Sequence, residues 1–144
     1  MRFILSLYFT IWNLVAVAQT NTIRNGHAHN DYLHQRPLFT ALENGFVSIE
    51  VDVFLHRGKM RVAHVPLALG IRKTSTELYL QPLANYLDTT KAVLQNPLIL
   101  MIDFKTSAKP TYDQLKKEIL PFQKYLMGYT KSGVFKEGDI QLLI

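Results

Sequence analysis

Short apolar runs alternate along this chain with longer segments in which apolar residues recur every three or four positions. In the clearest run, residues 47–55, every second residue is aliphatic, which is typical of a strand. The apolar runs predict strands at 23–27, 47–55, 60–64, 98–104 and 140–144. The periodic segments predict helices at 37–44, 81–95 and 111–125.

This order of elements is typical of an α/β fold. The run Leu98–Phe104 is almost wholly apolar, as expected of a parallel strand that is buried on both faces. A complete eight-stranded barrel of the TIM type takes ~250 residues, whereas this chain has 144 and stops inside its last apolar run. We therefore expect residues 19–144 to form one partial domain. It would be the N-terminal half of a TIM-type (β/α) barrel, truncated after about four parallel strands with their helices.

The first eighteen residues have the layout of a secretory signal peptide. Arg2 is followed by an apolar run that ends in Ala16-Val17-Ala18, which fits a small-residue cleavage site. We expect residues 1–18 to be removed and the protein to be secreted or periplasmic. The alternative is a retained membrane anchor, which the run disfavours because it is shorter than the ~20 residues that a spanning helix needs.

Charge and cysteine content narrow the function classes. The formal net charge of +5 suits an anionic partner, but the basic residues are scattered, and the densest basic spot is only Lys116-Lys117. A nucleic-acid interface would need a basic stripe with exposed aromatic residues, so we expect no nucleic-acid partner. The chain has no cysteine, which excludes disulfide bonds and a thiol nucleophile.

Acidic side chains stand on two of the predicted strands. Glu50 and Asp52 are two residues apart, so their carboxylates leave the same face of a strand, with Cα atoms about 6.6 Å apart. Asp103 ends the run that begins at Leu98, and Lys105 follows it on the same side. Three carboxylates suit one hard divalent cation, Mg²⁺ or Ca²⁺, while Lys105 adds a charge for a phosphate. The alternatives are solvent-facing acids for the pair and a helix cap for Asp103.

Three histidines also end predicted strands. His27 and His29 follow the first strand, and His64 ends the short return strand. Phosphodiester cleavage needs one group that takes a proton and one that gives a proton, and imidazole titrates near neutral pH. A zinc-type cluster of His-x-His with carboxylates is the alternative that this spacing leaves open.

Together these residues resemble the phosphodiesterase superfamily of glycerophosphodiester phosphodiesterases, phosphatidylinositol phospholipase C and sphingomyelinase D. The resemblance runs from Gly26 to Lys105 and is strongest to the branch named for altered inheritance of mitochondria. It rests on His29-Asn30-Asp31-Tyr32, on Arg36-Pro37-Leu38, and on the run Gly45–Val53 with its Glu-x-Asp pair.

The resemblance implies a metal-dependent phosphoric diester hydrolase, or a phosphodiester lyase, acting on a glycerophosphodiester-like or phospholipid-like substrate. It assigns the cation to Glu50, Asp52 and Asp103 and a phosphate contact to Lys105. It makes His64 one of the acid–base pair.

The second acid–base group is either His29 or His27, depending on which relatives are aligned. The sequence departs from the superfamily pattern at two places, one that bears on the substrate and one that bears on His64. Asn30-Asp31 stands where glycerophosphodiesterases have Arg-Gly, and Val65 follows His64 where many relatives have Asp. A competing interpretation is a catalytically inactive barrel fragment, or a module that binds phosphate or lipid. Besides the substrate, the expected partners are a membrane surface and a second copy of the chain, which would pair with the unpaired barrel edges.

Overall fold

The computed structural model describes residues 25–90 and 96–144, together with Ile23 and Leu94. The expected signal peptide, residues 1–18, lies outside the described residues. No helix of the described part is long and apolar enough to cross a lipid bilayer.

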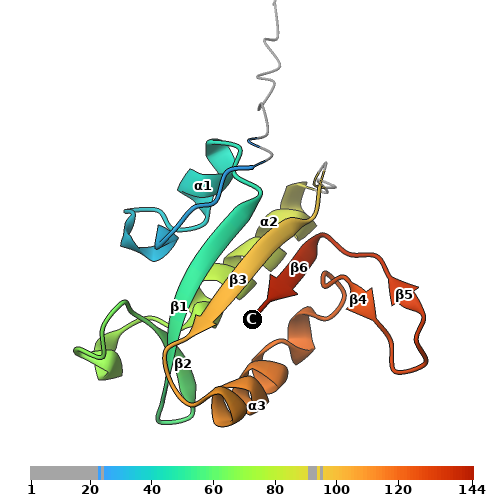
Figure 1. The fold of residues 1–144 in the computed structure, drawn as a ribbon. Coiled ribbons are helices and arrows are strands. Elements are labelled where there is room, and N and C mark those ends of the chain that lie inside the picture. Colours follow the sequence, from blue (N-terminus) through green and yellow to red (C-terminus); the bar gives the residue numbers. More distant parts are fainter. Residues whose placement is uncertain (1–22, 24, 91–93, 95) are drawn as a thin grey trace, which may run out of the picture.

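The described elements follow a mixed α/β order (Figure 1). The helices are α1 (Phe39–Glu43), α2 (Gln81–Thr90) and α3 (Ala108–Glu118), and one π-helical turn, Thr76–Leu80, runs directly into α2. The strands are β1 (Ser48–His56), β2 (Lys59–Val62), β3 (Leu98–Phe104), β4 (Gly128–Tyr129), β5 (Phe135–Lys136) and β6 (Ile140–Leu143). The strands expected at 47–55, 60–64, 98–104 and 140–144 are therefore present, with small shifts in their bounds.

The main sheet has four strands in the order β2-β1-β3-β6. Strands β1, β3 and β6 are parallel, which confirms the α/β class, but β2 runs antiparallel to β1. The reason is the hairpin turn at Arg57 and Gly58, whose φ angles of 50° and 71° suit a tight two-residue hairpin. The expectation of about four parallel strands is thus wrong by one strand. The described sheet is open, as in a partial β/α fold.

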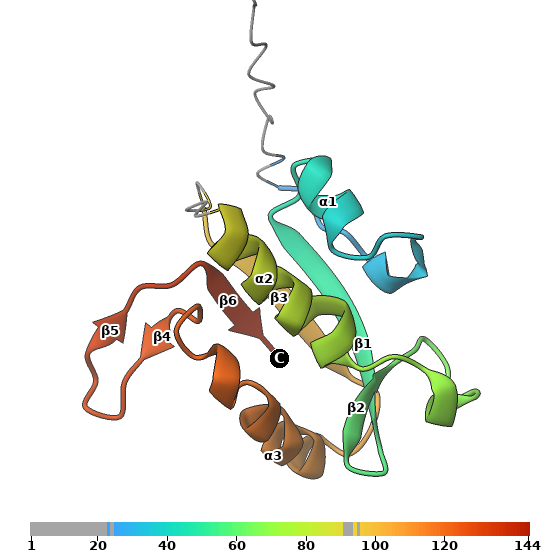
Figure 2. The same ribbon diagram turned by 180° about the vertical axis from the view of Figure 1, so that it is seen from behind.

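The two faces of the sheet differ in burial. Helix α2 covers one face, as the two opposite views show (Figures 1 and 2). Alternate residues of β1 and β3 are fully buried and join the core with Leu83 and Leu87 of α2. They are Ile49, Val51, Val53, Leu98, Leu100 and Ile102. Each such side chain contributes roughly 1.5–3 kcal/mol when it leaves water. The remaining alternate residues, Glu50, Asp52 and Asp103 among them, belong to the opposite face.

The strand predicted at 23–27 is wrong. The Gly26 N–H donates to the Ile23 carbonyl in a tight turn, and a side chain at Gly26 would clash with Ile23. Among the described residues of this segment, single parallel bridges link Ile23 to Phe46 and Ala28 to Ile49. The second bridge still places the two histidines around Ala28 next to β1.

Two predicted helices differ in their bounds. The helix predicted at 111–125 begins earlier, at Ala108, and ends at Glu118. Pro121 explains the end, because proline has no N–H to donate, and the chain continues as a short 3-10 helix, Leu120–Phe122. The helix predicted at 37–44 is reduced to α1. The helix predicted at 81–95 begins as expected and is described as far as Thr90, and residues 91–93 and 95 lie outside the described residues.

Candidate active site

Three carboxylates meet on the face of the sheet opposite α2. The parallel register of β1 and β3 places Asp52 directly beside Asp103, and Glu50 lies two residues earlier on the same face of β1. One carboxylate oxygen of each residue lies within 4.8 Å of the others. Glu50 and Asp52 are buried, with only 6% and 1% of their surfaces exposed.

The donor set of this cluster fits a hard divalent cation. Within the described part of the chain, Glu50 Oε2 and Asp52 Oδ1 are buried oxygens that accept no hydrogen bond. A buried carboxylate oxygen is costly unless positive charge compensates it. The nearby nitrogen atoms include Lys105 Nζ, 3.2 Å from Asp52 Oδ1, and His29 Nε2, 3.2 Å from Glu50 Oε2. Carboxylate oxygens are the ligands that Mg²⁺ and Ca²⁺ prefer. The site therefore has the chemistry that a cation of this kind requires.

Lys105 supplies a positive charge at the edge of the cluster. Its backbone N–H donates to the Val53 carbonyl, which fixes the residue just beyond the end of β3. Its Nζ donates to Asp103 and lies 3.2 Å from Asp52 Oδ1. The hydrogen bond to Asp103, with a smaller contribution from Asp52, raises the pKa of the Lys105 ammonium group. Lys105 therefore places a stable positive charge beside two of the carboxylates.

Asp52 also connects His64 to the cluster. His64 Nδ1 lies 3.1 Å from Asp52 Oδ2, and the Tyr32 hydroxyl lies 2.7 Å from the same oxygen. Burial, and next the hydrogen bond to Asp52, raise the pKa of the Tyr32 phenol well above its usual range. The phenol therefore remains protonated and donates to Asp52. Because Nδ1 of His64 faces a carboxylate, its proton belongs on that nitrogen, which leaves Nε2 free for chemistry.

Two further histidines approach Glu50 from the segment next to β1. His29 Nε2 lies 3.2 Å from Glu50 Oε2, and His27 Nε2 lies 3.7 Å from the same oxygen. The Ser48 hydroxyl lies 2.8 Å from His27 Nδ1 and so holds that ring from β1. His29 is more exposed, with 68% of its side chain accessible compared with 36% for His27. Both imidazoles therefore lie beside the cluster and in contact with solvent.

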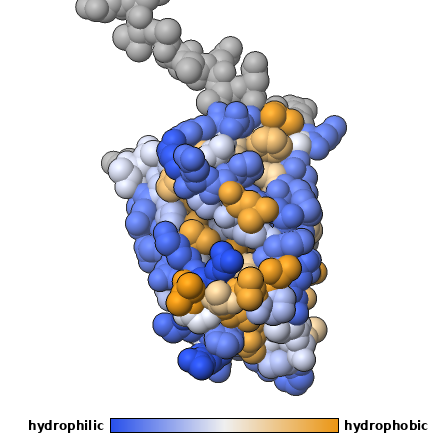
Figure 3. Space-filling view, turned by 90° about the vertical axis from the view of Figure 1, so that its left-hand side faces the viewer, coloured by the Kyte–Doolittle hydropathy of each residue, from blue (hydrophilic) through white to orange (hydrophobic). Residues whose placement is uncertain are grey.

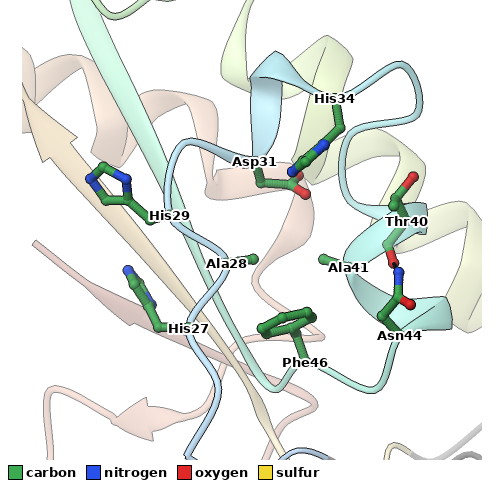
Figure 4. A pocket seen from close by; sticks show the side chains of 9 residues that line it. All are labelled: His27, Ala28, His29, Asp31, His34, Thr40, Ala41, Asn44 and Phe46. Carbon is green, nitrogen blue, oxygen red and sulfur yellow. Dashed lines mark hydrogen bonds between the residues drawn. The ribbon is translucent and has the colours of Figure 1, made fainter.

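A cavity of about 340 Å³ lies on the other side of the histidine segment, between it and α1. Figure 4 shows the His27 and His29 rings on one side of the chain and Ala28, Ala41 and Phe46 on the other. Asp31, which also lines this cavity, is fully buried. Its Oδ2 accepts hydrogen bonds from the Leu38 N–H and the Tyr79 hydroxyl. Asp31 therefore fixes the loop behind the cluster, and the His27 and His29 rings lie on the opposite side of the chain.

A second cavity, of about 400 Å³, adjoins His64 and Tyr32 directly. One wall comes from the loop after β2 and includes Val65, Arg72 and Lys73, and another comes from the segment before α1 and includes Leu33 and Pro37. This cavity is open space directly beside the His64 ring.

The structure brings together all seven residues that the sequence analysis identified as candidates. They are His27, His29, Glu50, Asp52, His64, Asp103 and Lys105. Sequence reasoning gave no role to Tyr32 or Ser48. The period of two along β1 places Ser48 on the face of Glu50 and would have found it. No spacing rule finds Tyr32, because a loop brings it to Asp52.

Comparisons with known proteins point to one family. The model of the AIM6-like phosphodiesterase domain matches residues 16–96, more than half of the chain. The Altered inheritance of mitochondria protein 6 homolog of Arthroderma benhamiae is 29% identical over 141 residues, covering 81% of this chain and 45% of that protein. Altered inheritance of mitochondria protein 6 of Zygosaccharomyces rouxii is 32% identical over 139 residues, covering 80% of this chain and 33% of that protein.

The chain spans less than half the length of these curated relatives. No solved structure matches it.

Proposed function

Since this chain belongs to the family of AIM6-like phosphodiesterase domains, we propose that it is a metal-dependent phosphodiesterase whose reacting groups surround Glu50, Asp52 and Asp103. The observation that carries the proposal is the convergence of three carboxylates, one lysine and three histidines on one face of an open α/β sheet. The substrate is a phosphoric diester of the glycerophosphodiester or phospholipid type. The sheet belongs to the first half of a β/α barrel, and the protein is exported.

The cation site consists of Glu50, Asp52 and Asp103. A bound Mg²⁺ or Ca²⁺ would supply positive charge to the phosphoryl oxygens. Lys105 adds a second positive charge from the edge of the cluster, where it already contacts two of the carboxylates. Charge placed where negative charge grows in the transition state is the largest contribution in many enzymes.

Proton transfer is assigned to His64 and to one of the two histidines beside Glu50. Asp52 holds the Nδ1 proton of His64, so Nε2 either takes a proton from the attacking hydroxyl or returns one to the leaving oxygen. His29 or His27 does the complementary step on the other side of the carboxylates. If the attacking hydroxyl belongs to water the reaction is hydrolysis, and if it belongs to the substrate a cyclic phosphate forms.

The experiment is cleavage of bis-p-nitrophenyl phosphate by the chain, with Mg²⁺ or Ca²⁺ and with a chelator. Glu50→Gln, which keeps the side-chain shape, and Asp103→Asn should abolish the metal-dependent rate. His64→Gln should lower the rate by about 10²–10⁴-fold, the usual contribution of a general acid or base. Lys131→Ala, an exposed residue outside the site, is the matched control.

Three results would overturn the proposal. The first is a cleavage rate that a chelator leaves unchanged. The second is a rate that falls no further in Glu50→Gln than in Lys131→Ala. The third is no cleavage at all by a chain whose circular dichroism and cooperative unfolding show that it is folded.

A further inference from the structure

The loop between β2 and the π-helical turn presents an unusual stretch of apolar side chains. Residues 65–71 read Val-Pro-Leu-Ala-Leu-Gly-Ile, seven consecutive residues without a polar side chain. Such a run normally lies in a core, yet here Leu67 is 68% exposed and Ile71 is 87% exposed. Val65 is also exposed, and Leu33 of a neighbouring loop is 69% exposed.

The base of this loop is held firmly while its tip projects. The Val62 N–H donates to the Lys73 carbonyl, and the Arg61 guanidinium donates to the Arg72 carbonyl. A bridge between Arg61 and Thr74 closes the base. The apolar tip is therefore carried on an anchored stem and does not fold back onto the core.

Positive charge lies immediately behind the tip. Arg72 and Lys73 follow Ile71 in the chain and are exposed. Among the described residues, neither takes part in an ion pair. The loop lies at the left of Figure 1 and so faces the viewer in Figure 3, where apolar residues lie beside strongly hydrophilic ones. Apolar side chains in front of unpaired cations match the layering of hydrocarbon and anionic head groups in a lipid surface.

The loop also adjoins the candidate active site. Val65, Arg72 and Lys73 line the cavity of about 400 Å³ that opens beside His64 and Tyr32, and Leu33 lines its other side. A group held at the tip of the loop would therefore reach the carboxylate cluster through this cavity.

We propose that residues 65–73 form an interfacial loop that docks on an anionic lipid surface, with Leu67 and Ile71 inserted and with Arg72 and Lys73 against the head groups. The loop would bring a lipid phosphodiester to His64 along the adjoining cavity, and this part rests on the proposed phosphodiesterase function. A lipid surface explains the exposed apolar tip and the unpaired cations together, whereas a neutral apolar partner would explain only the tip.

The test is flotation of the chain with vesicles of phosphatidylcholine alone and of phosphatidylcholine mixed with phosphatidylserine. Binding should need phosphatidylserine and should fall as salt is added. Arg72→Gln with Lys73→Gln should lower the partition coefficient about 30-fold, since each basic residue near an anionic surface contributes roughly fivefold. Leu67→Ser with Ile71→Ser should lower it by at least about tenfold.

Matched controls lie elsewhere on the surface. Leu120 and Val134 are 59% and 63% exposed, so the pair Leu120→Ser with Val134→Ser removes comparable apolar surface. Lys117→Gln with Lys131→Gln removes the same charge. Both control pairs should bind vesicles as the unaltered chain does.

The outcomes separate the two proposals. Glu50→Gln removes a cation ligand, so it should lose cleavage and retain vesicle binding. No cleavage by the folded, unaltered chain, together with loop-dependent vesicle binding, would overturn the phosphodiesterase and leave the lipid surface standing. The lipid proposal fails if the folded chain binds neither vesicle. It also fails if the chain binds both vesicles equally, or if the loop substitutions leave binding unchanged. Either result is expected if the apolar run at residues 3–18, and not the loop, binds the vesicles.

Discussion

The Tyr32 hydroxyl offers the sharpest test of how the site is held together. It donates to Asp52 Oδ2 over 2.7 Å, and Asp52 is only 1% exposed, so water compensates poorly for the loss of this donor. A hydrogen bond to a charged group contributes about 1.5–3 kcal/mol to the free energy of unfolding. Because Tyr32 is half-buried and His64 approaches the same oxygen, we expect Tyr32→Phe to cost about 1.5 kcal/mol, at the lower end of that range.

Thermal unfolding and a cation titration measure this prediction. A loss of that size should lower Tm by about 3–6 °C in a domain of this length. Removing a group that orients a metal ligand typically lowers metal affinity about 10–100-fold, an effect that a purely structural residue would not have. Tyr112→Phe is the control, because Tyr112 is exposed and lies on α3 away from the carboxylates.

The contribution of Tyr32 to the free energy of unfolding should depend on pH. The folded pKa of Tyr32 is raised, first by burial and then by Asp52, so the stability that it contributes is intact below the unfolded value and is lost at higher pH. The difference in unfolding free energy between the unaltered chain and Tyr32→Phe should therefore be constant near neutral pH and shrink above about pH 10. If Tyr32→Phe has the same Tm and the same cation affinity as Tyr112→Phe, this account of Asp52 is refuted.

Two further predictions concern parts of the fold that carry the site. Asp31→Ala should lower the free energy of unfolding by about 2–5 kcal/mol in a urea titration, because the Leu38 N–H and the buried Tyr79 hydroxyl both lose their acceptor, whereas Asp31→Asn, which keeps one oxygen, should cost less. Hydrogen bonds from two lysines of α3, with Lys116 having the larger effect and Lys109 the smaller, lower the pKa of Asp113 to about 2. The helix should therefore keep this contribution at neutral pH and lose it as pH falls from about 4 towards 2. A carboxyl titration followed by NMR, with a midpoint near the unperturbed value, would contradict that assignment.

The strands that carry the site were readable from sequence for a physical reason. Residues 47–55 alternate and residues 98–104 are almost wholly apolar, so both patterns report burial directly. Once these strands are parallel neighbours, acids at matching positions lie close together, and Asp52 and Asp103 indeed lie side by side. The residues of the carboxylate cluster could therefore be predicted from the sequence alone.

Other features depend on contacts that no local pattern encodes. The first predicted strand fails because Gly26 allows a close turn onto Ile23. Tyr32 reaches Asp52 from a loop, across twenty residues of sequence. The exposure of residues 65–71 also could not be predicted from the sequence, because an apolar run by itself predicts burial.

The most direct test of the central claim is a calorimetric titration of the folded chain with Mg²⁺ and with Ca²⁺. Asp103→Asn removes one carboxylate of the cluster, and Asp88→Asn, which removes an exposed carboxylate on α2, is the control. The account predicts a single cation site that is lost in Asp103→Asn and unchanged in Asp88→Asn. No binding by the folded chain, or equal binding by both variants, would contradict it.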